Sequence, residues 1–305
     1  MKKNYEQIFN NMVDKTQKYL ENNNLFAMIL GISGGIDSTV TAAICHEVEK
    51  RNPDLKFFGI SLPCTSNSVD ENNSAMTCMK AFCKENQYWV ENIQKEYLLM
   101  RGTCAQRHSI TTIGQGNLKA RLRMMYLYNE ANYFKGVVMD TDNLTEHYLG
   151  FFTIHGDVAD INPIGILWKH EVYELANYLL EKYKSLYNYT SPDSFNSSDE
   201  IKDKLELELK IKALENAIGI TPTDGNGVND LGDMGQIAPA FATEKNVVAY
   251  TKVDDIIDTY LNKYSKEYME ILYDNYGKDT VDNVINRIKR TEYKRQRLPI
   301  VVTQE

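Results

Sequence analysis

The stretch that decides the fold is LFAMILGISGGIDST, residues 25–39, in which an apolar run leads into two adjacent glycines flanked by serines and an aspartate. The run from Leu25 to Leu30 has the length of a buried strand. The residues that follow Asp37 place apolar side chains at helical spacing: Val40, Ala43, Ile44 and Val48. We therefore predict a strand, a tight loop and a helix, in that order.

A tight loop that opens a helix suits a phosphate, because backbone N–H groups and the positive end of the helix dipole point into one concavity. Gly34 and Gly35 allow a close approach of the backbone, and Ser33 and Ser38 add hydroxyl donors. Asp37 would repel a polyphosphate unless a cation lay between them, so it indicates a bound Mg²⁺. Two glycines alone would more simply be a helix entry. The full set of residues favours phosphate binding.

Composition excludes several classes of protein. The formal charge of -8 argues against general binding to nucleic acid. The five cysteines are odd in number and form no CxxC pair, which is typical of a reduced cytoplasmic protein without a zinc site. No apolar stretch approaches the length of a membrane span. We predict a cytoplasmic protein that contacts neither membrane nor nucleic acid.

Further strand-like runs occupy residues 55–62, 88–93 and 136–140, and each gap between them holds a candidate helix. Strands that alternate with helices predict an α/β fold: a Rossmann-like three-layer sandwich with a mostly parallel central sheet flanked by helices. Ligands of such folds bind at the carboxyl ends of the strands. We expect a single domain over 1–305, with residues 185–235 forming a surface excursion, a charged helix and a Gly/Asp-rich loop.

Two polar segments allow further structural predictions. Residues 101–116 contain three glycines and predict a loop, plausible as a lid. The helix over 199–219 is rich in charge, and its charges indicate a solvated face.

Later blocks decide which phosphate-binding family the chain resembles. In order, they are SGGIDS (33–38), NLKAR (117–121), DTDNLTEHYLGFFTIHGD (140–157), ADINP (159–163), Lys169, TPTDGN (221–226), VDDIIDTYL (253–261) and EYKRQ (292–296). Over nearly its whole length the chain resembles the ammonia-dependent NAD synthetase family of the ATP pyrophosphatase superfamily. The roughly 25 residues before the glycine loop are too few for an amidase domain. We therefore expect free ammonia, or ammonia from a partner, as the nitrogen donor.

The resemblance implies a two-step reaction with ATP, deamido-NAD and ammonia as substrates and Mg²⁺ as the metal. The nicotinate carboxylate attacks the α-phosphate of ATP, which gives an adenylate and pyrophosphate. Ammonia then displaces AMP and forms the amide of NAD. The resemblance also implies a homodimer with the dinucleotide near the interface.

The resemblance assigns roles residue by residue. Asp37 and Lys169 are the implied catalytic residues, and Asp37 and Glu146 the implied ligands of Mg²⁺. The implied ATP-binding residues are Gly31, Ile32, Ser33, Gly34, Gly35, Ile36, Asp37, Ser38, Thr141, Lys169 and Thr223. The implied deamido-NAD-binding residues are Arg121, Asp160, Tyr293 and Lys294.

The chain departs from the family pattern at several positions. Asp140 replaces a glycine, Ile154 replaces a substrate-binding lysine, and Tyr293 replaces a histidine. One lost cation contact costs on the order of 1–3 kcal/mol of binding. Three readings therefore stay open: an ammonia-dependent NAD synthetase, a related adenylating enzyme that amidates another carboxylate, and a nucleotide-binding homologue without catalysis.

Overall fold

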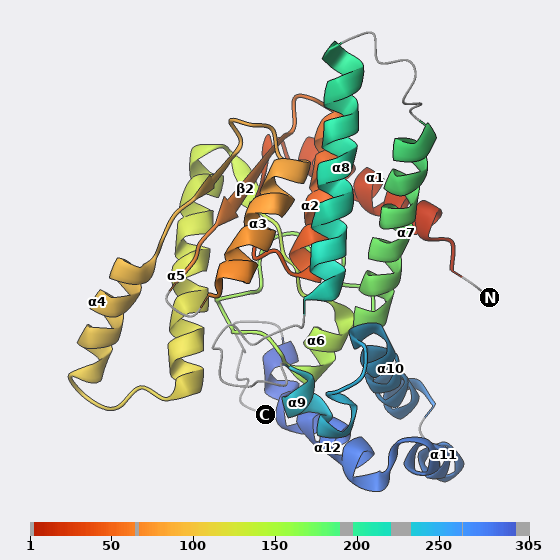
Figure 1. Ribbon diagram of the computed structural model, residues 1–305. Coiled ribbons are helices and arrows are strands. Elements are labelled where there is room, and N and C mark those ends of the chain that lie inside the picture. Colours follow the sequence, from red (N-terminus) through yellow and green to blue (C-terminus); the bar gives the residue numbers. More distant parts are fainter. Residues whose placement is uncertain (1–2, 65–66, 190–197, 221–232, 264, 297–305) are drawn as a thin grey trace.

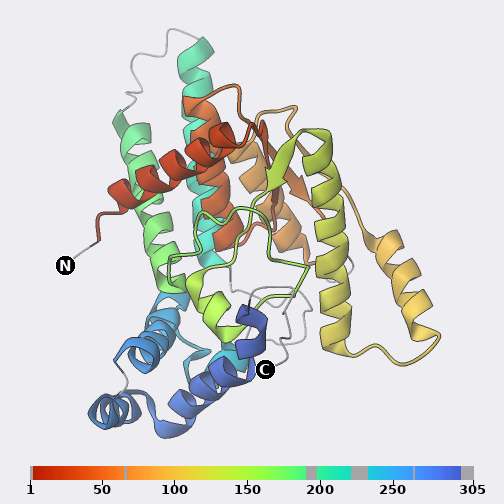
Figure 2. The same ribbon diagram turned by 180° about the vertical axis from the view of Figure 1, so that it is seen from behind.

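A computed structural model describes residues 3–64, 67–189, 198–220, 233–263 and 265–296 (Figures 1 and 2). Within them a four-stranded parallel sheet has the strand order β3-β2-β1-β4. The strands are β1 (Ala27–Gly31), β2 (Lys56–Ser61), β3 (Tyr88–Val90) and β4 (Gly136–Val138). Met28 pairs in register with Phe57 on one side and Val137 on the other. The predicted parallel sheet is confirmed.

Helices connect the strands, as parallel pairing requires. They are α2 (Ile36–Arg51), α3 (Val69–Phe82), α4 (Gln94–Ala105) and α5 (Thr112–Tyr133). The loop predicted over residues 101–116 is wrong, because α4 and α5 together occupy most of it. Thr111 caps α5 by accepting a hydrogen bond from the Gly114 N–H at 3.0 Å, which lets a glycine-containing segment begin a helix.

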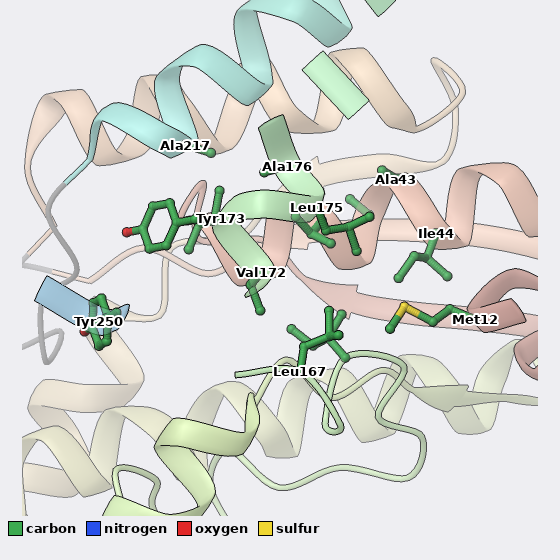
Figure 3. Packing of buried hydrophobic residues seen from close by; sticks show 14 of the residues in the cluster. Met12, Ala43, Ile44, Leu167, Val172, Tyr173, Leu175, Ala176, Ala217 and Tyr250 are labelled. Atoms are coloured by element: carbon green, nitrogen blue, oxygen red, sulfur yellow. The ribbon is translucent and has the colours of Figure 1, made fainter. Parts of the chain in front are cut away.

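Helices cover both faces of the sheet (Figures 1 and 2). One face carries α1 (Tyr5–Asn22), α2, α3, α7 (Lys169–Tyr189) and α8 (Ser198–Gly219), and the other carries α5. Met28 and Leu30 of β1 belong to the first core cluster, whereas Ala27 and Ile29 belong to the second, as the alternation of a strand requires. Figure 3 shows part of the first cluster, which includes side chains of α1, α2, α7, α8 and α10.

The C-terminal helices gather at one end of the molecule, beside α6 (Leu144–Leu149) (Figures 1 and 2). They are α9 (Met234–Ile237), η2 (Pro239–Phe241), α10 (Asn246–Asn262), α11 (Lys266–Tyr276), α12 (Lys278–Arg290) and η3 (Glu292–Arg295). Hydrogen bonds from Thr145 of α6 and His170 of α7 to Asp254 of α10 fix this end against the sheet layer. In the part of the chain that the structure describes, no helix is both long and apolar enough to cross a membrane.

The charged helix α8 carries one buried cation. Lys210 is 5% exposed, and its Nζ lies 2.9 Å from His46 Nε2 and 2.5 Å from Glu206 Oε1. His46 Nδ1 lies 2.8 Å from the carbonyl oxygen of Phe82, so the Nδ1–H tautomer leaves Nε2 free to accept from Lys210. The expected solvated face of α8 is therefore interrupted by a polar contact that joins α8 to α2.

Candidate active site

The loop between β1 and α2 requires glycine at position 34. Gly34 has φ +83°, and a Cβ there would lie 2.4 Å from the backbone nitrogen of Ala75. Ser74 Oγ donates to the Gly34 carbonyl oxygen at 3.1 Å, which holds α3 against the loop. Only a residue without a side chain fits both the dihedral angle and this close approach.

The two serines of the loop bind each other and the backbone. Ser33 Oγ lies 3.2 Å from Ser38 Oγ and accepts from the Gly35 N–H at 3.3 Å, and Ser38 Oγ donates to the Gly35 carbonyl at 3.1 Å. Gly35 is the N-cap of α2 and has no side-chain oxygen to offer to the first-turn N–H groups. An anion can therefore bind those groups at the positive end of the helix.

A cavity of about 330 Å³ opens at the carboxyl ends of β1 and β2. Most of the residues predicted for ATP and the metal line it: Gly31, Ile32, Ser33, Gly35, Ile36, Asp37, Ser38, Thr141, Glu146 and Lys169. Gly34 is not among its lining residues and packs against α3 instead. Thr223 lies outside the residues that the structure describes.

Three charged side chains meet at one wall of this cavity. Lys169 is the first residue of α7 and is 1% exposed. Its Nζ lies 2.5 Å from Asp37 Oδ2 and 2.8 Å from Glu146 Oε1. Burial lowers the pKa of Lys169, but the charges of Asp37 and Glu146 outweigh it and hold that pKa well above its usual range. Burial raises the pKa of Glu146 to about 7, with Lys169 opposing the shift.

Asn143 holds the other oxygen of each carboxylate. Its Nδ2 donates to Asp37 Oδ1 at 2.9 Å, and its backbone N–H donates to Glu146 Oε2 at 3.1 Å. Asn143 also caps α6, since its Oδ1 accepts from the Glu146 N–H at 3.0 Å. Sequence reasoning missed this residue, although the spacing of Asn143 and Glu146 is that of a capping box.

The donor set of this cluster fits Mg²⁺. Asp37 and Glu146 each bind Lys169 through one oxygen and Asn143 through the other, and each oxygen keeps a further lone pair for a cation. Mg²⁺ binds through one or two carboxylates and takes its remaining ligands from phosphate oxygens and water. Among the described residues, no group of three or more His, Cys, Asp or Glu side chains is placed to hold a metal alone. The protein would thus supply two ligands.

Arg123 is a cavity residue that was not among the predicted site residues. Its Nε donates to the Leu62 carbonyl at 2.9 Å, its Nη2 donates to Asn67 Oδ1 at 3.3 Å, and burial lowers its pKa. Arg121 was predicted to bind deamido-NAD. It is exposed, does not line the cavity, and donates from Nε to the Ile154 carbonyl at 3.2 Å. The two arginines lie on different faces of α5, as their spacing predicts.

The other residues predicted for deamido-NAD also lie outside this cavity. Asp160 accepts from the Tyr128 hydroxyl at 2.9 Å and from the Val138 N–H at 3.0 Å. Lys294 Nζ donates to the carbonyl oxygens of Gly150 and Phe152, at 2.7 Å and 2.5 Å. Tyr293 is 56% exposed. Asp160 and Lys294 thus bind the protein's own backbone.

Asp140 bridges two loops. It is 4% exposed, and its carboxylate accepts from the backbone N–H groups of Asp142 at 2.7 Å and Ala159 at 2.8 Å. It lines a second cavity of about 240 Å³ together with Asp142, Leu144, His147, Tyr148, Phe152, Val158, Asn162 and Gly165. The side chain that departs from the family pattern is therefore occupied by internal hydrogen bonds.

Comparison with known proteins gives one consistent family. A family model described as NAD synthase matches residues 8–222. The NH3-dependent NAD+ synthetase of Helicobacter pylori strain J99 is 33% identical over 67% of this chain and 75% of its own length. The enzyme of the same name from Methanocaldococcus jannaschii is 33% identical over 69% of this chain and 79% of its own length.

Solved structures share the fold. An NMN synthetase from Francisella tularensis superposes with a TM-score of 0.70 at 22% identity and covers 99% of both chains. An NH3-dependent NAD synthetase from Campylobacter jejuni gives a TM-score of 0.66 at 22% identity, over 99% of this chain and 100% of that one. At this level of identity the likeness concerns the path of the backbone.

Proposed function

Because the chain belongs to the NAD synthase family, we propose that it amidates the nicotinate carboxylate of deamido-NAD with ammonia and ATP. In the first step a carboxylate oxygen attacks the α-phosphate of ATP, and pyrophosphate leaves. In the second, ammonia attacks the acyl carbon of the adenylate, AMP leaves, and a proton is lost to give the amide. The observation that carries the proposal is the meeting of Asp37, Glu146 and Lys169 beside the glycine loop.

The glycine loop is the proposed binding site of the ATP polyphosphate. It combines the uncapped start of α2 with the hydroxyls of Ser33 and Ser38, all at the wall of one cavity. Phosphate oxygens accept from such N–H and O–H donors without any change of protonation. The loop would therefore hold the leaving pyrophosphate in place while its charge develops.

The charged cluster has the proposed task of balancing that charge. Asp37 and Glu146 would hold Mg²⁺, which when bound neutralises negative charge on phosphate oxygens. Lys169 carries three N–H donors, of which two point to the carboxylates. The third would donate to a phosphate oxygen at the same wall of the cavity.

The proposed function leaves one point for experiment to decide, namely which substrate carboxylate is amidated. Ile154 replaces a family lysine, and Asp160 and Lys294 are engaged with backbone groups. These observations favour, as a second candidate, the same chemistry on another carboxylate. Nicotinate mononucleotide belongs in the test because one structure of the same fold is named an NMN synthetase. We further propose a homodimer that acts in the cytoplasm.

A product assay tests the proposal. The protein is mixed with ATP, Mg²⁺, ammonium and either deamido-NAD or nicotinate mononucleotide, and the amide, AMP and pyrophosphate are quantified. Equal amounts of NAD and AMP from deamido-NAD support the proposal. Product from nicotinate mononucleotide alone supports the second candidate, the same chemistry on another carboxylate. If ATP binds but neither compound gives product, a screen of other carboxylates for ATP-dependent pyrophosphate release separates a different substrate from a homologue without catalysis. Asp37→Asn is the control that should abolish turnover.

A further inference from the structure

Asp254 of α10 binds the chain neighbours of both Glu146 and Lys169. Its carboxylate is 2% exposed and accepts a short hydrogen bond from the Thr145 hydroxyl. It also accepts from the His170 backbone N–H at 3.1 Å, and His170 Nδ1 lies 2.7 Å from the same oxygen. Asp254 lines neither cavity, so it acts on the site through other residues.

The Thr145 hydroxyl links α6, which carries Glu146, to α7, which carries Lys169. Its Oγ1 accepts from the Lys169 backbone N–H at 2.8 Å while its proton goes to Asp254. A hydroxyl has a single proton, so the bond to Asp254 fixes its orientation and leaves a lone pair for Lys169. Thr145 is 0% exposed, and no water can replace either partner without entering the core.

These bonds cap the start of α7. The first N–H groups of a helix have no partner within it, and here Lys169 and His170 direct theirs to Thr145 and Asp254. A carboxylate at this end of a helix is also favoured by the helix dipole. Glu146 follows Thr145 in α6, and Lys169 precedes His170 in α7. One carboxylate on a third helix therefore contacts the chain neighbours of both Glu146 and Lys169.

We propose that Asp254 is a positioning residue that sets the placement of Lys169 against Glu146 through Thr145 and His170. The proposal rests on the proposed function, because it takes Lys169 and Glu146 as the charges that serve the polyphosphate. Lys169 Nζ lies within 2.8 Å of both carboxylates. Small displacements of such groups reduce catalysis by up to about 100-fold.

The test compares two substitutions of the same hydroxyl. Thr145→Val keeps the shape and removes the oxygen, whereas Thr145→Ser keeps the oxygen and removes a methyl group. Ile257→Val is the packing control, since Ile257 is 0% exposed on α10. The readouts are kcat and KM for ATP, calorimetric binding of pyrophosphate with Mg²⁺, and the thermal unfolding midpoint.

We expect Thr145→Val to lower kcat by about 10- to 100-fold and to weaken pyrophosphate binding. Thr145→Ser and Ile257→Val should stay within about threefold of the wild type in both readouts. Asp254→Asn should also lower kcat, because its amide keeps one acceptor oxygen and must direct its NH2 group at either the Thr145 hydroxyl or the His170 N–H. Unfolding midpoints show whether a loss of activity reflects a loss of folded protein.

Two results would overturn the proposal, and they differ from each other. If Thr145→Val binds pyrophosphate and turns over like Thr145→Ser, Asp254 is structural only and the proposed function stands. If the wild type neither forms an amide product from ATP and ammonia nor binds pyrophosphate in the presence of Mg²⁺, the proposed function itself fails, and this proposal fails with it.

Discussion

Asn143 Nδ2 donates to Asp37 Oδ1 at 2.9 Å, although the two residues lie 106 positions apart in the chain. Through this bond the cap of α6 and the glycine loop share one carboxylate. The same side chain accepts from the Glu146 N–H at 3.0 Å. Both proposed metal ligands therefore depend on Asn143.

Asn143→Asp separates these two tasks. An aspartate still caps α6, since Asp and Asn are both strong N-caps, but it cannot donate to Asp37 and places a like charge beside it. We expect a weaker apparent affinity for Mg²⁺ and a lower kcat. In Asn143→Ala the cap is lost as well, at about 0.5–2 kcal/mol of stability. Titration of activity with Mg²⁺ and urea unfolding measure the two effects. Unchanged Mg²⁺ dependence in Asn143→Asp would exclude the assigned role.

Replacing Lys169 by methionine keeps the packing and removes the ammonium. Glu146, whose pKa is already raised to about 7 by burial, would then lose the cation that opposes this shift, so its pKa should rise further. The acidic limb of the kcat profile should move to higher pH, and kcat should fall by about 100-fold or more. Lys169→Arg, which retains charge but not shape, is the comparison. A pH profile identical to that of the wild type would contradict the role of Lys169.

Substitution by alanine should affect stability much more at Gly34 than at Gly35. A Cβ on Gly34 meets the Ala75 nitrogen at 2.4 Å with φ +83°, whereas one on Gly35 meets only Ser33 Oγ at 3.4 Å. We expect Gly34→Ala to lower the free energy of unfolding by about 1–3 kcal/mol or more. Gly35→Ala should change it by less than about 1 kcal/mol. Chemical denaturation measures both, and equal losses would mean that the approach of α3 to the loop is unimportant.

Arg121 and Arg123 form a matched pair on α5. Arg123 lines the cavity, so Arg123→Ala should raise the KM for ATP by about tenfold, the cost of one charge-assisted hydrogen bond. Arg121→Ala leaves the cavity intact and should leave that KM within about threefold. If Arg121 binds the second substrate, as the family resemblance implies, only the KM for deamido-NAD should rise. Steady-state kinetics with each substrate varied in turn separate these effects.

The lowered pKa of His46 predicts that the protein loses stability in acid. Burial and the charge of Lys210 lower the pKa of His46 to about 4. Between its ordinary pKa of about 6.5 and this value, the unfolded chain binds a proton that the folded chain does not. The free energy of unfolding should therefore fall as pH decreases from about 6.5 to 4, by an amount on the order of 1–3 kcal/mol. His46→Gln should flatten this slope in urea unfolding curves, and an equal slope in both proteins would contradict the prediction.

Local patterns in the sequence predicted the sheet and the loop. The apolar run before Gly31 and the helical spacing after Asp37 are properties of neighbouring residues, and they correspond to β1 and α2. The segment 101–116 was predicted wrongly because glycines there signalled a loop. The Thr111 cap and the packing of α5 on the sheet outweigh that signal.

Contacts between distant segments could not be predicted in the same way. The burial of Lys210 and the hydrogen bond from Thr145 to Asp254 produce no periodic pattern in the sequence, because each depends on how two helices pack. Sequence reasoning found the block that contains Asp254 but gave it no role. Spacing showed that Arg121 and Arg123 lie on different faces of one helix, but it could not show that Arg123 lines the cavity.

The family model ends at residue 222, whereas Asp254 belongs to α10, beyond that limit. The segment that the family model matches therefore lacks an acceptor for two of its own hydrogen-bond donors. Its helices α6 and α7 present a hydroxyl and an N–H whose acceptor comes from the C-terminal part of the chain. A substitution at Thr145 or at Asp254 therefore changes the hydrogen bonding of both parts of the chain. A version of this chain that ended before α10 would leave the Thr145 hydroxyl and the His170 N–H without their acceptor.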